Sequence, residues 1–568
     1  MSFPRFALFW CICVSAVSSS ALDREAFTFT HYLLDVRVEP EQQRLAVRGT
    51  ITLRNDSAAP QKNAVLQISS SLDWRSIRVE GSPVQFVSQV YTSDIDHTGA
   101  LSEAIVTLPR VVQPHAMIDL QIGYEGVVAQ NATRLTRVEI PEEKARHSDW
   151  DQISREFTAV RGIGYVTWYP VATEAANLSQ GNSVFEAVGR WKAKEVGSEM
   201  SLSFSTTAKQ PVLASGTRTN FTVLNLDSKD SNKYSSYTIV NFGVTVPSFV
   251  LADYDVSEKP AFSKVYYLPG HENAARLYSE ESAKLQDFIS FLGRGHGSVT
   301  VAELADSEAA PFESDEMLLT PLSRDAQFVD ITLVHALAHT HFRSARPWID
   351  EGLAHFAQAL WREQQAGRQA ALDYMGPHRT ALEATEKAAA EQKDSAAAQS
   401  LISTSEEEYY RSKAMFVWWM LRDMVGDVAL KRAIAGYESQ RDTQPSYVQK
   451  LIEKQSHRDL EWFFDDWVYR DRGLPDFRVA SAYTRQMLNG TYLLTVSVEN
   501  RGGAGAEVPL RVRLEGGDVT SRVEVRSNAT GVVRIEVPSP PREIVVNDGS
   551  VPEADTGNNT FEIQKSKN

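Results

Sequence analysis

Two adjacent amphipathic segments, together residues 329–361, constrain the fold of this chain more than any other feature of the sequence. The first segment reads VDITLVHALAHTHF, which puts His335 and His339 at i and i+4 on one face of a helix. After a short connection that contains Pro347, apolar residues recur at helical spacing in the second segment. The pattern predicts a helical hairpin, with Glu351 one turn into its second helix.

These polar residues carry the chemistry of a metal site. Two imidazoles from one helix and a carboxylate from the next are typical of catalytic zinc, which has three protein ligands and one open position. The sequence therefore predicts one Zn²⁺ per chain, bound by His335, His339 and Glu351. The alternative is two structural histidines on a partly buried helix face, because the HxxxH spacing alone is a weak signal.

The residue that follows the first histidine is unusual for a hydrolytic zinc site. In zinc peptidases this position holds a glutamate that takes a proton from the metal-bound water. Here it is Ala336, and we expect its small side chain to face an open cleft. The pattern thus predicts a metal site without its general base.

At these residues the chain resembles the gluzincin zinc metallopeptidases, most closely the membrane alanyl aminopeptidase family. That family has HExxH followed by a second helix with W-L-x-E-G, and this chain has HALAH followed by W-I-D-E-G. The resemblance implies a zinc peptidase scaffold with a peptide or protein as substrate or ligand. The connection between His339 and Glu351 is shorter than in the family, and the G-x-M-E-N motif that holds the substrate amine is absent.

The resemblance also implies roles for residues outside the hairpin. The segment E-S-D-E-M-L-L-T lies where the missing motif is expected, so by analogy Glu313 or Glu316 would bind substrate. Tyr410 is similar to the tyrosine that stabilises the oxyanion, although it precedes Lys413 by three residues rather than two.

A further histidine lies close to the predicted ligands in the sequence. His355 follows Glu351 by four residues, on the same flank of the second helix, where a residue commonly orients the first ligand. The structural alternatives are a half-buried histidine here and, for Tyr410, a tyrosine that caps a core helix.

The N-terminus has the composition of a secretory signal. Arg5 precedes an apolar run at 6–17 and a small-residue cleavage site that ends near Ala21. Both cysteines lie inside this run, so the chain after cleavage has no disulfide or thiolate ligand. We expect a signal peptide at 1–21, export to the periplasm or the exterior, and no transmembrane segment afterwards.

The net charge of −15 argues against nucleic acid as a partner. Nothing in the sequence predicts an oligomeric state.

The remaining periodicity predicts a multidomain α+β protein. Short alternating runs separated by Gly, Pro, Asn and Asp indicate an N-terminal antiparallel β-sandwich at 22–254. Helical periodicity marks a mainly helical, gluzincin-like domain at 255–473, with a helix at 273–292 and a strand at 298–304. Alternation returns at 474–568, which reads as a small immunoglobulin-like sandwich.

Three functions remain open on the sequence. The first is a peptidase homologue that binds zinc but hydrolyses peptides weakly or not at all. The second is an active metallopeptidase or aminopeptidase that uses another carboxylate as base, with Glu316 and Asp350 as candidates. The third is a peptide- or protein-binding module without metal.

Overall fold

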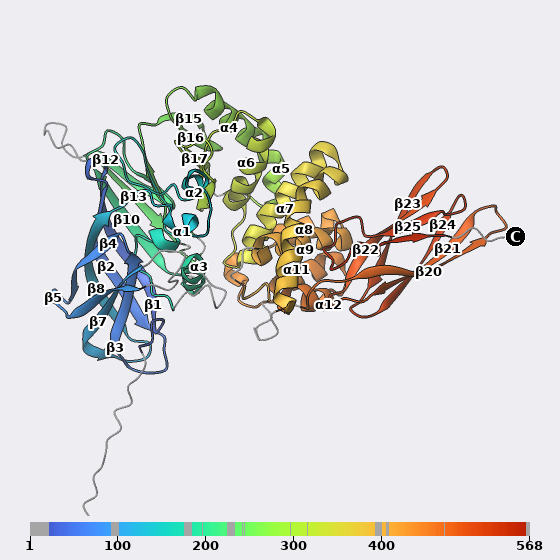
Figure 1. Ribbon diagram of the computed structural model, residues 1–568, viewed down its shortest axis with the longest axis horizontal. Coiled ribbons are helices and arrows are strands. Elements are labelled where there is room, and N and C mark those ends of the chain that lie inside the picture. Colours follow the sequence, from blue (N-terminus) through green and yellow to red (C-terminus); the bar gives the residue numbers. More distant parts are fainter. Residues whose placement is uncertain are drawn as a thin grey trace, which may run out of the picture.

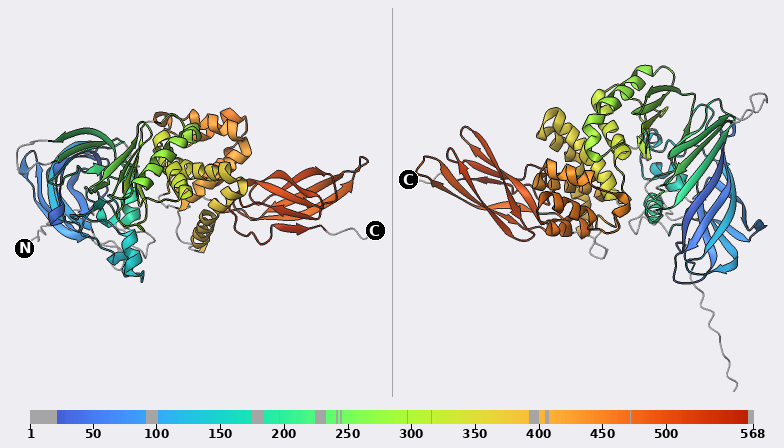
Figure 2. Two further views of the ribbon diagram at one scale, coloured as in Figure 1. Left: turned by 90° about the horizontal axis from the view of Figure 1, so that it is seen from above. Right: turned by 180° about the vertical axis from the view of Figure 1, so that it is seen from behind.

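The computed structural model describes residues 22–563, apart from 92–100, 175–183, 224–232, 392–399, 405–407 and single positions 196, 241, 244, 296, 315 and 471. The predicted signal peptide at 1–21 lies outside the described residues. Strands form both ends of an elongated molecule and helices lie between them (Figure 1), and two further views show the same order (Figure 2). Among the residues described, no helix is long and apolar enough to cross a membrane.

The N-terminal part is built on an eight-stranded sheet with the order β12-β13-β10-β1-β2-β8-β4-β5. A three-stranded sheet, β3-β7-β6, shares one buried core with it. Buried and exposed side chains alternate along much of β1 and β2, as expected for strands with one face on a core. The strands are β1 (Phe27–Glu39), β2 (Arg44–Asn55), β3 (Gln61–Ser69), β4 (Leu72–Val79), β5 (Ser82–Pro83), β6 (Phe86–Tyr91), β7 (Leu101–Val112), β8 (Met117–Val127), β10 (Glu199–Thr206), β12 (Thr217–Val223) and β13 (Lys233–Ile239).

The prediction of a purely antiparallel sandwich is wrong at the centre of this sheet. Strands β1 and β10 run parallel, with His31 opposite Glu199 and Val38 opposite Thr206. A parallel pair needs a long crossover connection, and the chain between these two strands contains several other elements. Alternation within a strand carries no information about the direction of its partner.

Small elements connect the N-terminal sheet to the rest of the chain. They are the helices α1 (Thr133–Thr136), α2 (Glu142–Ser148) and α3 (Val184–Lys194), and the sheet of β11 (Leu213–Ala214), β14 (Phe249–Leu251) and β9 (Thr158–Val160). A separate core cluster contains residues of β9, β11 and β14 together with residues of β17 and β19. The boundary predicted at 254 therefore falls between two elements, β14 and β15, with one main core on each side of it, and only this small third cluster spans it.

A five-stranded sheet precedes the long helices, in the order β15-β16-β17-β19-β18. Its strands are β15 (Asp255–Lys259), β16 (Ser263–Tyr267), β17 (Val299–Glu303), β18 (Phe312–Ser314) and β19 (Met317–Thr320). The strand predicted at 298–304 is confirmed as β17. The other four were missed because runs of three to five residues are too short to show a period of two.

Helices form the middle of the molecule. They are α4 (Glu272–Lys284), α5 (Gln286–Ile289), α6 (Ala326–His341), α7 (Pro347–Ala366), α8 (Arg368–Glu391), α9 (Ala414–Val425), α10 (Asp427–Ala435), α11 (Tyr447–Ser456) and α12 (Glu461–Phe464), with π-helical segments η5 (Glu408–Lys413) and η7 (Asp465–Tyr469). The predicted helical hairpin is confirmed as α6 and α7.

Helix α7 lies at the centre of the helical packing, against α6, α8, α9 and η5. Gly352 allows the close approach of α7 and α9, since a Cβ atom there would lie 2.7 Å from Ala414 Cβ. Next to this contact, Trp348 of α7 stacks on Trp418 of α9 with ring centroids 5.6 Å apart. These contacts fix the position of the first turns of α7 relative to α9.

The C-terminal part has two antiparallel sheets, β20-β21-β24 and β23-β22-β25-β26. The strands are β20 (Phe477–Gln486), β21 (Tyr492–Asn500), β22 (Ala506–Leu514), β23 (Gly517–Val525), β24 (Thr530–Val537), β25 (Glu543–Val546) and β26 (Thr560–Glu562). Their inward side chains belong to the same buried cluster as the long helices. The boundary predicted at 473 thus falls between η7 and β20, but the core continues across it.

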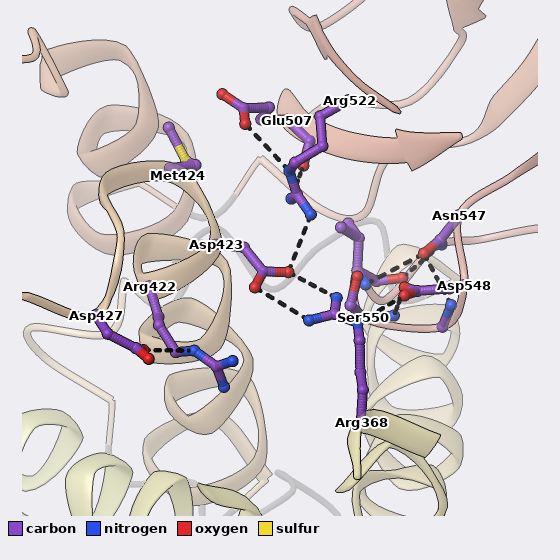
Figure 3. Close-up of polar contacts among 12 residues, drawn as sticks. Arg368, Arg422, Asp423, Met424, Asp427, Glu507, Arg522, Asn547, Asp548 and Ser550 are labelled. Carbon is purple, nitrogen blue, oxygen red and sulfur yellow. Dashed lines mark hydrogen bonds and ion pairs between the residues drawn. The ribbon is translucent and has the colours of Figure 1, made fainter. Parts of the chain in front are cut away.

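Ion pairs connect the helices to this C-terminal part (Figure 3). Asp423 at the end of α9 accepts hydrogen bonds from Arg368 of α8 and from Arg522 of β23. Arg368 also contacts Asp548, and Arg522 contacts Glu507 of β22. One carboxylate from the helices is therefore bound by arginines from both sides of the junction.

Candidate metal centre

Local sequence explains why both helices of the site begin where they do. The Asp325 carboxylate accepts hydrogen bonds from the backbone N–H groups of Gln327 and Phe328, which caps the start of α6. Helix α7 begins with Pro347, a residue favoured in the first turn because its missing N–H would have no partner there. The two predicted histidines lie on α6 and Glu351 lies in the first turns of α7.

The structure brings the three predicted ligands together. His335 Nε2 lies 3.2 Å from His339 Nε2 and 3.5 Å from Glu351 Oε2, and His339 Nε2 lies 3.7 Å from Glu351 Oε1. A tetrahedral zinc ion with bonds of about 2.0–2.2 Å holds its ligand atoms about 3.3–3.6 Å apart. The donor types and their spacing fit a single zinc ion.

A fourth donor lies at the same point. Glu313 of β18 places Oε2 3.2 Å from His335 Nε2 and 3.9 Å from His339 Nε2. This oxygen is buried, and it makes no hydrogen bond to any residue that the structure describes. An unpaired buried carboxylate oxygen is costly, and a bound cation would satisfy it. Among the described residues, two groups have donor atoms within 4.8 Å of one another: Glu313 with His335 and His339, and His335 with Glu351 and His355.

The outer ring nitrogens of both histidines also have partners. His335 Nδ1 lies 3.3 Å from Gln358 Oε1, and His339 Nδ1 lies 3.3 Å from Asp350 Oδ2. Because an amide or carboxylate oxygen only accepts, each Nδ1 donates in these contacts, which leaves Nε2 as the atom that can bind a metal. Gln358 is itself fixed, since its Oε1 accepts from Tyr374 OH and its Nε2 donates to Ile331 O.

The electrostatic field at the cluster favours a cation. Burial lowers the pKa of His339, but the hydrogen bond and charge of Asp350, with the charges of Glu351 and Glu313, raise the pKa to about 10. Burial raises the pKa of Glu351, but His335, Arg411 and His339 outweigh it and hold that pKa well below the usual range. Three carboxylates thus surround two imidazoles, and this arrangement stabilises a positive charge among them.

The two glutamates predicted to bind substrate, Glu313 and Glu316, have different partners in the structure. Glu313 reaches the histidines, whereas Glu316 forms an ion pair with Arg343 at 2.6 Å. Asp350, considered from the sequence as a replacement base, binds the outer nitrogen of His339 and accepts from the Ser344 N–H. The role of either carboxylate as a replacement base stays a prediction, which peptide hydrolysis will test.

Ala336 is only 2 % exposed and belongs to the main buried cluster. The expectation that it faces an open cleft is therefore wrong. The reason is that α6 is packed on several sides here, so that its residues next to the two histidines are also buried.

The two remaining candidates lie beside the ligands. His355 packs edge-on against His335 with ring centroids 4.7 Å apart. Burial, followed by the charges of His335 and Arg411, lowers the pKa of His355 well below its usual range. Tyr410 lies on η5 and packs against the main core, and burial, with the charges of Glu351 and Glu408, raises its pKa.

Sequence reasoning missed Gln358 and Arg411. Gln358 follows Glu351 by seven residues, so it shares the helix face of Glu351 and His355, and this spacing was the available signal. Arg411 Nε lies 3.5 Å from Glu351 Oε2. Arg411 stands in a π-helical segment, whose wider turn differs from the α-helical spacing assumed from the sequence.

No family model matches the chain, and no curated protein sequence matches it. Solved structures of the M1 zinc metallopeptidase from Deinococcus radiodurans are similar to it in fold. A mutant form has a TM-score of 0.47 at 17% identity and covers 79% of this chain and 96% of its own. The same mutant bound to a Tyr-Ser-Ala substrate has a TM-score of 0.46 at 17% identity, with the same 79% and 96% coverage. The enzyme without that mutation has a TM-score of 0.45 at 17% identity and covers 76% of this chain and 90% of its own.

Proposed function

We propose that this chain is an exported zinc-binding protein with a metallopeptidase-like site that hydrolyses peptide bonds weakly or not at all. The observation that carries the proposal is the convergence of His335, His339 and Glu351 within 3.2–3.7 Å, with alanine at the adjacent Ala336. The motifs HALAH and WIDEG support a peptidase origin of this site.

Each residue has a definite part in this proposal. His335, His339 and Glu351 would hold zinc, and Gln358 and Asp350 would keep the two rings in the binding tautomer. With only these three ligands, zinc would keep one open position and act there as a Lewis acid on a carbonyl group; a fourth protein ligand would fill that position. Ala336 offers no proton acceptor, and a positioned general base typically contributes about 10²–10⁴-fold to the rate.

The contacts of the other carboxylates favour this proposal over an active enzyme with a replacement base. Asp350 and Glu316 are already bound to His339 and Arg343. The buried Glu313 Oε2 has no hydrogen-bond donor among the described residues and lies beside both imidazoles, which favours the proposal over a binding module without metal. The ligand of the protein, under this proposal, is a peptide or a protein segment.

Zinc content and peptide hydrolysis together test the proposal. The full chain without the signal peptide should carry one zinc, and His335→Ala or Glu351→Ala should reduce it far below one. His457→Asn is the matched control: it changes a histidine outside the site at a left-handed position, φ 54°, that asparagine tolerates. Zinc-loaded wild type should release products from unblocked and N-blocked peptides at or near the background rate.

Two results would contradict the proposal in different ways. Wild type with well under one zinc would remove the metal site. Efficient, zinc-dependent hydrolysis by wild type would show that another group serves as the base.

A further inference from the structure

We propose that Glu313 is a fourth protein ligand of the metal, which closes the site instead of leaving one position open for water. This inference rests on the proposed zinc site at His335, His339 and Glu351 and gives that site a different character. Sites with four protein ligands are structural, whereas catalytic zinc keeps an open position.

The distances place the Glu313 carboxylate among the ligand atoms. Its Oε2 lies 3.2 Å from His335 Nε2, the same distance that separates the two histidine nitrogens. A carboxylate that acts on metal-bound water lies one hydrogen bond beyond that water. The distance from such a carboxylate to the ligand nitrogens would therefore exceed the distance between the two nitrogens. The separation of 3.9 Å from His339 Nε2 closes to a ligand spacing with a shift of about half an ångström.

The strand that carries Glu313 fixes its direction. Successive side chains of a strand point to opposite faces, so Glu313 points away from the side of Phe312 and Ser314. Ser314 is 2 % exposed and donates a hydrogen bond to Val246 O, and Phe312 packs against the cluster that contains β9 and β14. With both neighbours anchored on one face, the carboxylate faces the histidines of α6.

Charge balance supports a closed site. The two carboxylates of Glu313 and Glu351 equal the charge of Zn²⁺, and the outer carboxylate of Asp350 is matched by the guanidinium of Arg411 near Glu351. Buried charges persist when they are paired or when they coordinate a metal. The charges in direct contact with the site therefore balance when zinc is bound.

Zinc affinity is the first test. A competition titration against a chromophoric chelator compares wild type, Glu313→Ala and Glu313→Gln with Glu316→Gln, whose carboxylate pairs with Arg343 outside the cluster. Loss of a ligand should weaken zinc binding by more than the about 10–100-fold typical of a lost orienting partner. Glu316→Gln should leave the affinity unchanged.

Cobalt(II) in place of zinc supplies a readout that does not depend on activity. The visible spectrum of the cobalt-loaded wild type should not respond to added azide, because no coordination position is open. Glu313→Ala opens one position, so azide should change its spectrum. The wild-type arm requires no variant to fold.

The outcomes separate this inference from the proposed function. If wild type binds zinc, azide changes its cobalt spectrum and Glu313→Ala keeps the affinity, then Glu313 is not a ligand but the metal site stands. Wild type that binds neither zinc nor cobalt overturns both proposals.

Discussion

At the scale of single residues, the two histidines depend on what binds their outer nitrogens. Asp350 holds His339 through Nδ1 at 3.3 Å, and Gln358 holds His335 through Nδ1 at the same distance. Both partners lie on α7, the helix that also provides Glu351. The geometry of the α6 ligands is therefore set by the neighbouring helix as much as by their own.

We expect Asp350→Asn to weaken zinc binding by about 10–100-fold, the usual effect of losing an orienting partner. The amide keeps an acceptor for the Ser344 N–H but loses the negative charge beside His339. A competition titration measures the change, with Asp373→Asn, on the exposed face of α8, as control. Equal affinities of both variants and wild type would show that Asp350 does not support the site.

At the scale of elements, the approach of α7 to α9 determines where Glu351 lies. Gly352 is the contact point, and a Cβ atom there would meet Ala414 Cβ at 2.7 Å and Trp418 Cδ1 at 3.1 Å. Neither neighbour has room to yield, because Ala414 and Trp418 are at most 1 % exposed. Position 352, next to Glu351, thus requires glycine for steric reasons alone.

We expect Gly352→Ala to lower the free energy of unfolding by about 1–3 kcal/mol, the usual cost of overpacking a core. It should also weaken zinc binding, because α7 must move away from α9 and takes Glu351 with it. The matched control is Gly189→Ala in α3, where an added Cβ meets nothing within 4 Å and no proline follows. The control should be as stable as wild type or gain up to about 1 kcal/mol from better helix propensity. Denaturant unfolding measures both, and equal stability of the two variants would remove the steric argument.

At the scale of the whole molecule, the C-terminal sandwich is joined to the helices by a shared core and by ion pairs. Trp467 of η7 donates to Gly505 O, and Asp466 accepts from the Gly505 N–H. Asp423 lies between Arg368 and Arg522, with its side chain 8% exposed. We expect the helices and the sandwich to unfold together.

Asp423→Ala should lower the free energy of unfolding by about 1–3 kcal/mol, between the values for exposed and buried ion pairs. The loss arises because the two arginines remain partly buried without their common carboxylate. Asp427→Ala is the control, since the Asp427 side chain is 55% exposed and pairs with Arg422. The control should lose less than about 1 kcal/mol. A loss no larger than that of the control would contradict the role of Asp423 at the junction.

The sequence by itself determined the helical hairpin and its polar residues, because helix periodicity and the signals of Asp325 and Pro347 act within a few residues. The choice of the three metal ligands stays a prediction, which zinc analysis will test. Alternation likewise indicated strands at both ends of the chain, since a period of two is a local property.

Only the tertiary structure decided which groups surround the hairpin. It separated Glu313 from Glu316, although they are three residues apart, because one faces α6 and the other meets Arg343. It paired β1 with β10 in parallel and buried Ala336. These outcomes depend on contacts between segments far apart in the chain, and no local pattern records which segments will meet.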